Sequence, residues 1–217
     1  MDAQDVPGHV LIADDHPLFR SALRQVIAAI SPDCVVTEAD CLDQAAAAAG
    51  RSHDLDLILL DINMPGMEGF NGLISLLNSI PATPIMVVSA DSRPDTIQRA
   101  MTLGAAGFMP KSMDVDKMTT AVRAVLAGEV FVPADHSGPA HGHRDDHGDF
   151  GRRYESLTPQ QRKVLEMLVR GKPNKVIAYE MEVTESTVKA HVSAILHKLN
   201  VTSRTQAVLN ASKLLED

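Results

Sequence analysis

The chain has 217 residues, of which 45% are hydrophobic and 22% charged, and its formal net charge is −8. This composition is typical of a globular protein with one or two domains, and it excludes collagen-like and highly charged low-complexity chains. The first residues lack a signal-peptide pattern, and no apolar run approaches the ~18 residues of a membrane helix, so we expect a cytoplasmic protein. Because Cys34 and Cys41 are the only cysteines and Trp is absent, we expect buried free thiols and no stacking surface for single-stranded nucleic acid.

Charge is distributed unevenly along the sequence. Residues 1–132 carry a net charge of −9, residues 133–153 carry −1, and residues 154–217 carry +2. This asymmetry predicts two modules with different partners. The basic excess of the last segment is too small to identify nucleic acid as a partner from charge alone.

Short apolar runs alternate with helical patterns in the first 130 residues. Strands are expected at 10–13, 34–37, 57–60, 85–88 and 107–109, and helices at 18–30, 42–49, 70–80, 96–103 and 115–127. The first four runs are almost continuously apolar, which is typical of strands buried on both faces of a parallel sheet. The sequence therefore predicts a doubly wound (βα)5 domain of the α/β class. Other doubly wound folds share this alternation, so it indicates the class and not the function.

Residues 133–153 interrupt this pattern and predict a flexible linker, because they are rich in Pro, Gly, His and Asp. The segment contains residues able to bind a transition metal: His136, His141, His143, His147, Asp145 and Asp146. We favour a solvated tether over a dedicated metal site, because such tracts bind metals without fixed geometry.

From residue 157 onward the pattern is helical. Thr158 is expected to cap a first helix with Pro159 at its start, Asn174 a second over 175–181, and Thr184 a third that runs to residue 199. Ser203 begins a fourth helix, which continues to residue 215. Four short helices with tight turns predict a small all-α bundle.

Polar residues mark the carboxyl ends of four predicted strands, where open parallel sheets place their sites. Asp14 and Asp15 follow the first strand, Asp61 the third, Ser89 the fourth and Lys111 the fifth. Three converging carboxylates repel one another unless a divalent cation neutralises them, and oxygen ligands favour Mg²⁺. An Asp beside Mg²⁺ and a Lys is suited to attack a phosphoryl group, and a nearby hydroxyl can hydrogen-bond the resulting acyl phosphate.

These motifs, in segments 11–17, 60–69, 88–90 and 104–111, make residues 9–130 similar to a response-regulator receiver domain. The resemblance implies that Asp61 is the phosphoacceptor, that Asp14 and Asp15 bind Mg²⁺, and that the Asn63 main-chain carbonyl is a further ligand. It also implies a switch hydroxyl, a switch aromatic residue and a phosphate-binding lysine at Ser89, Phe108 and Lys111, respectively.

The third helix of the second module separates into two faces. Its apolar face contains Val188, Val192, Ile195 and Leu199, and its opposite face Ser186, Lys189, Ala190, Ser193 and His197. The side chains of the second face are mostly small or polar, so this face could enter a major groove, although an ordinary solvated helix has the same pattern. The preceding helix and the short turn 182–184 favour a helix-turn-helix.

Segments 157–165, 174–178, 186–192 and 203–208 make residues 155–212 similar to a LuxR/NarL-type DNA-binding domain. The resemblance implies that Lys189, Ala190 and Ser193 face the bases. The resemblance also implies that four further residues lie near the DNA phosphates: Asn174, Lys175, Thr187 and Lys198. The last helix resembles the dimer surface of that family, and its apolar residues could equally be core: Ala207, Val208, Ala211 and Leu214.

Together these features predict a receiver domain at 1–132, a linker at 133–153 and a helix-turn-helix domain at 154–217. The chain is identified as a two-component response regulator of the NarL/LuxR (FixJ-type) family, a transcription regulator rather than an enzyme. Its expected partners are a histidine kinase that phosphorylates Asp61, double-stranded DNA and, when phosphorylated, a second copy of itself. An aspartyl-phosphate hydrolase is an alternative, which Asn63 disfavours because such enzymes need an acid there. A phosphorylation-independent regulator is a third alternative, which the intact acid site disfavours.

Overall fold

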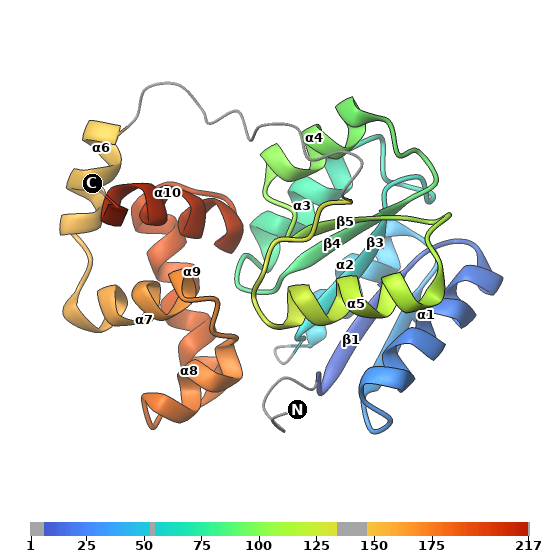
Figure 1. Cartoon of the computed structure of the whole chain (residues 1–217), viewed down its shortest axis with the longest axis horizontal. Coiled ribbons are helices and arrows are strands. Elements are labelled where there is room, and N and C mark those ends of the chain that lie inside the picture. The colour runs from blue at the N-terminus through green and yellow to red at the C-terminus, as the bar shows by residue number, and fades with distance from the viewer. Residues whose placement is uncertain (1–6, 53–54, 134–146, 217) are drawn as a thin grey trace.

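The computed structural model describes residues 7–52, 55–133 and 147–216. Two bodies are visible in Figure 1, an α/β body formed by the first part of the chain and a helical body formed by the last part. None of the helices within these described residues is long and apolar enough to cross a membrane.

Five parallel strands form one sheet in the order β2-β1-β3-β4-β5. The strands are β1 (His9–Ala13), β2 (Val35–Ala39), β3 (Leu57–Asp61), β4 (Ile85–Ser89) and β5 (Gly107–Pro110). Their register pairs Asp61 with Val88 and Ser89 with Pro110, so the polar residues at the carboxyl ends lie along one edge of the sheet. The predicted doubly wound α/β class is confirmed.

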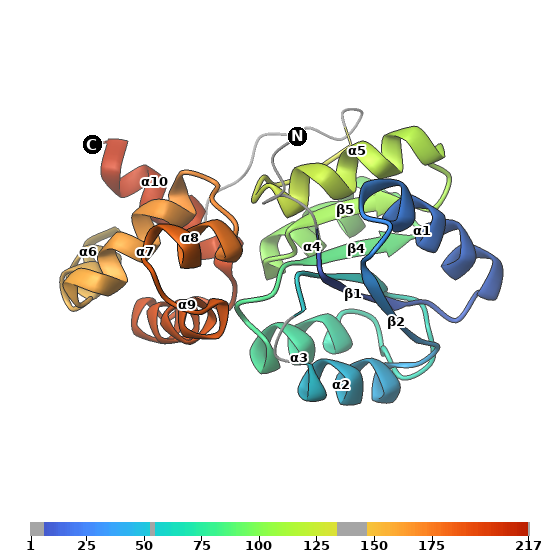
Figure 2. The ribbon, with the colours of Figure 1, turned by 90° about the horizontal axis from the view of Figure 1, so that it is seen from below.

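Helices cover both faces of this sheet (Figure 2). One face is covered by α1 (Pro17–Ile30) and α5 (Val115–Leu126), and the other by α2 (Leu42–Arg51), α3 (Asn71–Ser79) and α4 (Pro94–Leu103). Successive strand residues point to opposite faces, as Phe108 and Met109 of β5 do: Phe108 packs in the cluster under α2, α3 and α4, and Met109 packs against α1 and α5.

The expectation that four strands are buried on both faces is wrong for β2. All residues of β3 and β4 are buried, whereas Val35 of β2 is 58% exposed. The physical reason is position, because β2 lies at an edge of the sheet.

The expectation of buried thiols is also wrong, because Cys34 and Cys41 are free but only half-buried. Burial of the Cys34 sulfur is the main cause, and the negative charge of Asp56 a smaller one, of a rise in the pKa of this thiol to about 11. Cys34 therefore remains a neutral thiol at ordinary pH.

The second body contains five helices among the described residues, one more than expected. They are α6 (His147–Glu155), α7 (Pro159–Val169), α8 (Asn174–Glu180), α9 (Glu185–Leu199) and α10 (Arg204–Glu216). The linker prediction is therefore wrong for residues 147–153, where α6 packs on this body and buries Phe150. His136, His141, His143, Asp145 and Asp146 lie outside the described residues.

Two of the three predicted helix caps are confirmed. Thr158 and Gln161 form a reciprocal capping box at α7, and the Thr184 hydroxyl accepts a hydrogen bond from the Thr187 amide at α9. Asn174 does not cap α8, because Pro173 occupies that position and Asn174 is the first helical residue. Its carboxamide instead donates to the Ala82 carbonyl oxygen at 3.3 Å.

Replacing Thr158 with Ala should lower the free energy of unfolding of the helical body by about 1 kcal/mol, because an amide at the start of α7 loses its acceptor. Urea unfolding followed by circular dichroism measures this loss. The matched control is the exposed neighbour Gln160, whose change to Ala should stay within about 0.5 kcal/mol. Equal losses for the two variants would contradict the capping role.

Candidate functional site

One lysine connects two buried carboxylates at the carboxyl edge of the sheet. The Lys111 Nζ lies 2.7 Å from Asp14 Oδ2 and 2.9 Å from Asp61 Oδ2. Both carboxyl groups are only 1% exposed. Asp14 follows β1, Asp61 is the last residue of β3 and Lys111 follows β5, so the parallel topology itself brings them together. The structure thus brings these three predicted residues together.

The charge state of Lys111 follows from this contact. Burial lowers the pKa of Lys111, but its ionic contacts with Asp14 and Asp61 raise the pKa by more, so the net shift is upward. The lysine therefore stays protonated throughout the physiological range and offsets the repulsion between the two carboxylates. The Phe19 ring also faces this cation, with its centroid 5.0 Å from Nζ.

Main-chain amides orient the two buried carboxylates. The Asn63 amide donates to Asp61 Oδ1 and the His16 amide donates to Asp14 Oδ1, both at 2.8 Å. In both cases the donor amide lies two residues after the acceptor. The loop that follows each acid therefore holds the carboxylate of that acid in a fixed orientation.

The geometry also brings in His16, which sequence analysis did not assign to the site. Its Nδ1 lies 2.7 Å from Asp15 Oδ1. The sequence feature that could have identified His16 as part of the site is its position directly after Asp14 and Asp15.

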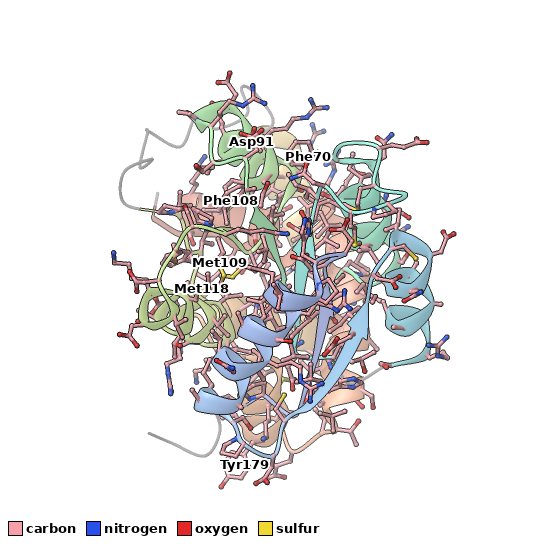
Figure 3. All side chains as sticks on the ribbon, turned by 90° about the vertical axis from the view of Figure 1, so that its right-hand side faces the viewer. Phe70, Asp91, Phe108, Met109, Met118 and Tyr179 are labelled. Atoms are coloured by element: carbon pink, nitrogen blue, oxygen red, sulfur yellow. The ribbon has the colours of Figure 1, made fainter. Side chains whose placement is uncertain are left out.

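The buried Ser89 hydroxyl is held on the α4 side of the site. It accepts hydrogen bonds from the Asn63 carboxamide at 3.0 Å and from the Asp91 amide at 3.1 Å. Figure 3 shows the receiver end of the molecule that faces away from the helical body, with Asp91 and Phe108 labelled. Phe108 is 0% exposed. The two residues with implied switch roles, Ser89 and Phe108, are thus both buried.

The loop after β4 is fixed by ionic contacts at the start of α4. Asp91 accepts hydrogen bonds from the Arg93 side chain and from the Thr96 hydroxyl. The bonds from Arg93, rather than burial, lower the pKa of the Asp91 carboxyl well below its usual range.

The residues present fit a divalent cation. Asp14 Oδ2 and Asp15 Oδ1 are buried and receive no hydrogen bond from the described residues, although Lys111 and His16 nitrogens lie close to them. Asp14, Asp15, His16 and Asp61 each offer a ligand atom, and these four atoms lie within 4.8 Å of one another. Carboxylates together with free positions for water are the usual environment of Mg²⁺.

The predicted recognition helix is α9, and its apolar face is confirmed as core. Val188, Val192, Ile195 and Leu199 are all 0% exposed. On the opposite side Ala190 is exposed and Ser193 is half-buried.

Lys189, which we expected to point outward into solvent, has a side chain only 12% exposed. Its Nζ donates to the Leu55 carbonyl oxygen of the first body at 3.1 Å and lies 3.0 Å from Glu185. The expectation fails because the Lys189 side chain reaches a main-chain carbonyl oxygen of the other body.

Among the residues that the structure describes, four side-chain donors of the helical body reach the first body. The pairs, donor first, are Lys189 and Leu55 (3.1 Å), Asn174 and Ala82 (3.3 Å), Thr202 and Leu103 (3.4 Å), and Gln206 and Thr102 (3.0 Å). Every acceptor is a main-chain carbonyl oxygen. The acceptors lie in the segments that enter β3, β4 and β5, so this contact is at the amino edge of the sheet, opposite the acid cluster.

Glycines permit the close approach of the two bodies at two positions. Gly104, with φ +103°, faces Ser203, and Gly128, with φ +88°, faces the Gly171 carbonyl. A Cβ at either glycine would collide with these neighbours.

The other predicted DNA contacts lie on different parts of the helical body. Lys175 is exposed, and the Thr187 hydroxyl lies 2.8 Å from the Thr184 hydroxyl. Lys198 Nζ donates to Gln161 Oε1 at 2.9 Å, so it also joins α9 to α7. In the last helix Ala207 and Ala211 are core residues at 0% exposure, whereas Leu209 is 47% exposed.

Comparison with known proteins supports both domain predictions. Residues 10–123 match the response regulator receiver domain family, and residues 155–211 match the luxR family of bacterial regulatory proteins. The glycerol metabolism activator of Pseudomonas putida is 45% identical over 210 residues, covering 94% of this chain and 95% of that protein. The nitrate/nitrite response regulator NarL of Escherichia coli K12 is 36% identical over 205 residues, covering 94% of each.

Solved structures agree in fold. RcsB of Salmonella typhimurium superposes with a TM-score of 0.56 at 21% identity, covering 95% of this chain and 98% of that one.

The matched domains and the acid edge of the sheet define a two-domain signalling protein. The chain belongs to the response regulators that join a receiver domain to a LuxR-type DNA-binding domain, the NarL/LuxR family of transcription regulators. It is a DNA-binding regulator and not an enzyme.

Changing Lys111 to Ala should lower the free energy of unfolding of the receiver domain by about 3 kcal/mol without divalent cation, because two buried carboxylates lose their counter-charge. Millimolar Mg²⁺ should restore part of the loss. Thermal unfolding with and without Mg²⁺ measures both effects.

The matched control is Lys117, which pairs with Asp114 at 3.0 Å on the surface, where its side chain is 75% exposed. Its change to Ala should cost less than about 1 kcal/mol. A Lys111 variant as stable as this control would contradict the central role of the lysine.

Proposed function

We propose that a partner histidine kinase phosphorylates Asp61 and that this modification controls binding of the helical domain to double-stranded DNA. The observation that carries the proposal is the buried Asp61 carboxylate held against Lys111, 2.9 Å away, at the receiver edge. The phosphorylated protein acts as a homodimer in the cytoplasm, with exposed apolar residues of α10 such as Leu209 contributing to the dimer.

The reaction is a phosphoryl transfer to a carboxylate. An Asp61 oxygen attacks the phosphorus of the kinase phosphohistidine, the new O–P bond forms as the P–N bond breaks, and the leaving imidazole takes up a proton from solvent. Lys111 neutralises charge on the transferred oxygens, and the Asn63 amide keeps the carboxylate oriented. Mg²⁺, held by Asp14, Asp15, Asp61 and the Asn63 main-chain carbonyl, would supply further positive charge to the phosphoryl group.

Helix α4 connects the phosphorylation site with the domain contact. Its first turn is held by Asp91, whose amide donates to the Ser89 hydroxyl. Its last residues include Thr102 and Leu103, whose carbonyl oxygens accept hydrogen bonds from the helical domain. A ten-residue helix is about 15 Å long and moves as one body. We infer that Ser89 turns toward the acyl phosphate, with Phe108 accommodating the change, and that α4 transmits it.

The domain contact holds the DNA-binding residues in a closed form. Lys189 and Asn174, which the family resemblance assigns to DNA, are both hydrogen-bonded to receiver carbonyls. DNA and the receiver therefore compete for the same donors. Phosphorylation would favour the open form by weakening the α4 contacts, so that Lys189, Ala190 and Ser193 reach bases, with Lys175, Thr187 and Lys198 near phosphates.

Acetyl phosphate with Mg²⁺ should label the protein on Asp61, because a small phosphodonor needs only the carboxylate, the cation and Lys111. Asp61→Asn should take no label, whereas the exposed Asp95→Asn control should label like the parent. Mass spectrometry of intact protein measures the added phosphate. Normal labelling of Asp61→Asn would refute the assignment of the phosphoacceptor.

Lys189 should react slowly with an amine acetylating reagent in the unphosphorylated protein, because the receiver covers it. We expect a rate at least about fivefold below that of the exposed Lys175, and an increase for Lys189 after phosphorylation. Peptide mass spectrometry reads both sites in one sample. Asp61→Asn should show no increase, and equal initial rates for the two lysines would argue against the closed form.

Lys189→Ala should cost ~1–3 kcal/mol at a specific DNA site and relax preference at one base pair, because a base contact is lost. Lys198→Ala should weaken binding to all sequences alike and reduce the salt slope by roughly one unit, as loss of a phosphate contact does. Affinities for a promoter site and a scrambled site across salt concentrations distinguish the two roles. Sequence-independent losses for both variants would exclude base reading by Lys189.

A further inference from the structure

His16 occupies a fixed place beside the acid pair. Its Nδ1 lies 2.7 Å from Asp15 Oδ1 and 3.2 Å from Asp14 Oδ1. Its main-chain amide donates to the same Asp14 oxygen at 2.8 Å. His16 also directly precedes α1, with Pro17 as the first helical residue, so its backbone is held on both sides.

The apolar core does not hold the imidazole in this position. The His16 side chain is 67% exposed, and its Nδ1 is 3.5 Å from Lys111 Nζ. The ring therefore faces the charged groups of the site with one nitrogen, while most of its surface is open to solvent.

The distances are those of a ligand set. One atom from each of Asp14, Asp15, His16 and Asp61 lies within 4.8 Å of the other three. A first-row divalent ion bonds its ligands at about 2.0–2.2 Å, so ligand atoms opposite each other are about 4.2 Å apart. Small movements of the exposed ring bring Nδ1 into this range.

Ligand chemistry then separates two classes of cation. Mg²⁺ takes oxygen ligands and water and gains little from imidazole. Ions later in the first transition row bind imidazole nitrogen well. We propose that His16 Nδ1 is a direct ligand for borderline divalent ions at this site, which therefore binds ions such as Co²⁺ or Ni²⁺ through three carboxylates and one imidazole. This inference rests on the proposed cation site, and it adds a second class of cation to it.

Co²⁺ is a suitable probe, because it shifts the NMR signal of a coordinated imidazole N–H far outside the ordinary range. The test uses the full chain with His136, His141, His143 and His147 changed to Asn, which removes imidazoles that bind metal elsewhere. In this parent, Co²⁺ should give one shifted N–H signal that excess Mg²⁺ removes.

The additional change His16→Asn should abolish the signal and weaken Co²⁺ binding by about tenfold or more, while Mg²⁺ affinity changes less than about threefold. Asn keeps a polar side chain beside the acid pair but lacks the imidazole ligand. Calorimetric titration measures both affinities. As a control, Asp14→Asn should weaken both ions.

Three outcomes would overturn the inference. A shifted N–H signal that survives in His16→Asn assigns the nitrogen to another residue, and equal losses for Co²⁺ and Mg²⁺ mean that His16 only positions the acids. Absence of Mg²⁺-displaceable Co²⁺ binding would refute the imidazole ligand, whereas the Mg²⁺ titration tests the cation site of the proposed function separately. Acetyl phosphate labelling of the parent with Mg²⁺ tests Asp61 separately, so failure of the imidazole ligand and failure of Asp61 as phosphoacceptor remain distinguishable.

Discussion

The pairing of one lysine with two buried carboxylates is the constraint on which the receiver domain depends. Asp14 and Asp61 are too buried to share an edge of the sheet as bare anions, and Lys111 supplies the compensating charge. In the proposed phosphorylation the same arrangement would make the site reactive. A cation that loosened the contact between Lys111 and the acids would leave a nucleophilic carboxylate and an ammonium ready for an incoming phosphoryl group.

Much of the fold and of the acid site was predictable, because both depend on local patterns. Apolar runs give the strands, and once the strands are parallel their carboxyl ends meet, which places Asp14, Asp61, Ser89 and Lys111 along one edge. The exposure of β2 was not predictable, since strand order depends on contacts between distant segments. Helix α6 was missed because Phe150 and Tyr154 are its few apolar anchors in an otherwise polar stretch.

The domain contact was beyond sequence reasoning for a similar reason. Lys189 lies on the polar face of an amphipathic helix, and local periodicity predicts that such a residue is solvated. Its acceptor is the carbonyl of Leu55, 134 positions away. A main-chain carbonyl acceptor cannot be predicted from the pattern of side chains, because every residue has a main-chain carbonyl. The sequence therefore indicated the two domains and their chemistry, but it did not indicate which surfaces of the two domains are in contact.

The four described hydrogen bonds between the domains have a genetic consequence, because the receiver contributes a main-chain oxygen to each of them. Substitutions of receiver side chains at Leu55, Thr102 or Leu103 leave the acceptor atoms in the chain, so few of them should disrupt the closed form directly. The Ala82 side chain is different, because it is buried in the core cluster of the helical domain. Selection for variants that bind DNA without a signal should instead recover changes in the donors of the helical domain, or at Gly104 and Gly128, where a side chain separates the domains sterically. The polar contacts of the closed form are thus robust to most changes of receiver side chains, with Ala82, Gly104 and Gly128 as exceptions, and sensitive to changes of the donor side chains in the helical domain.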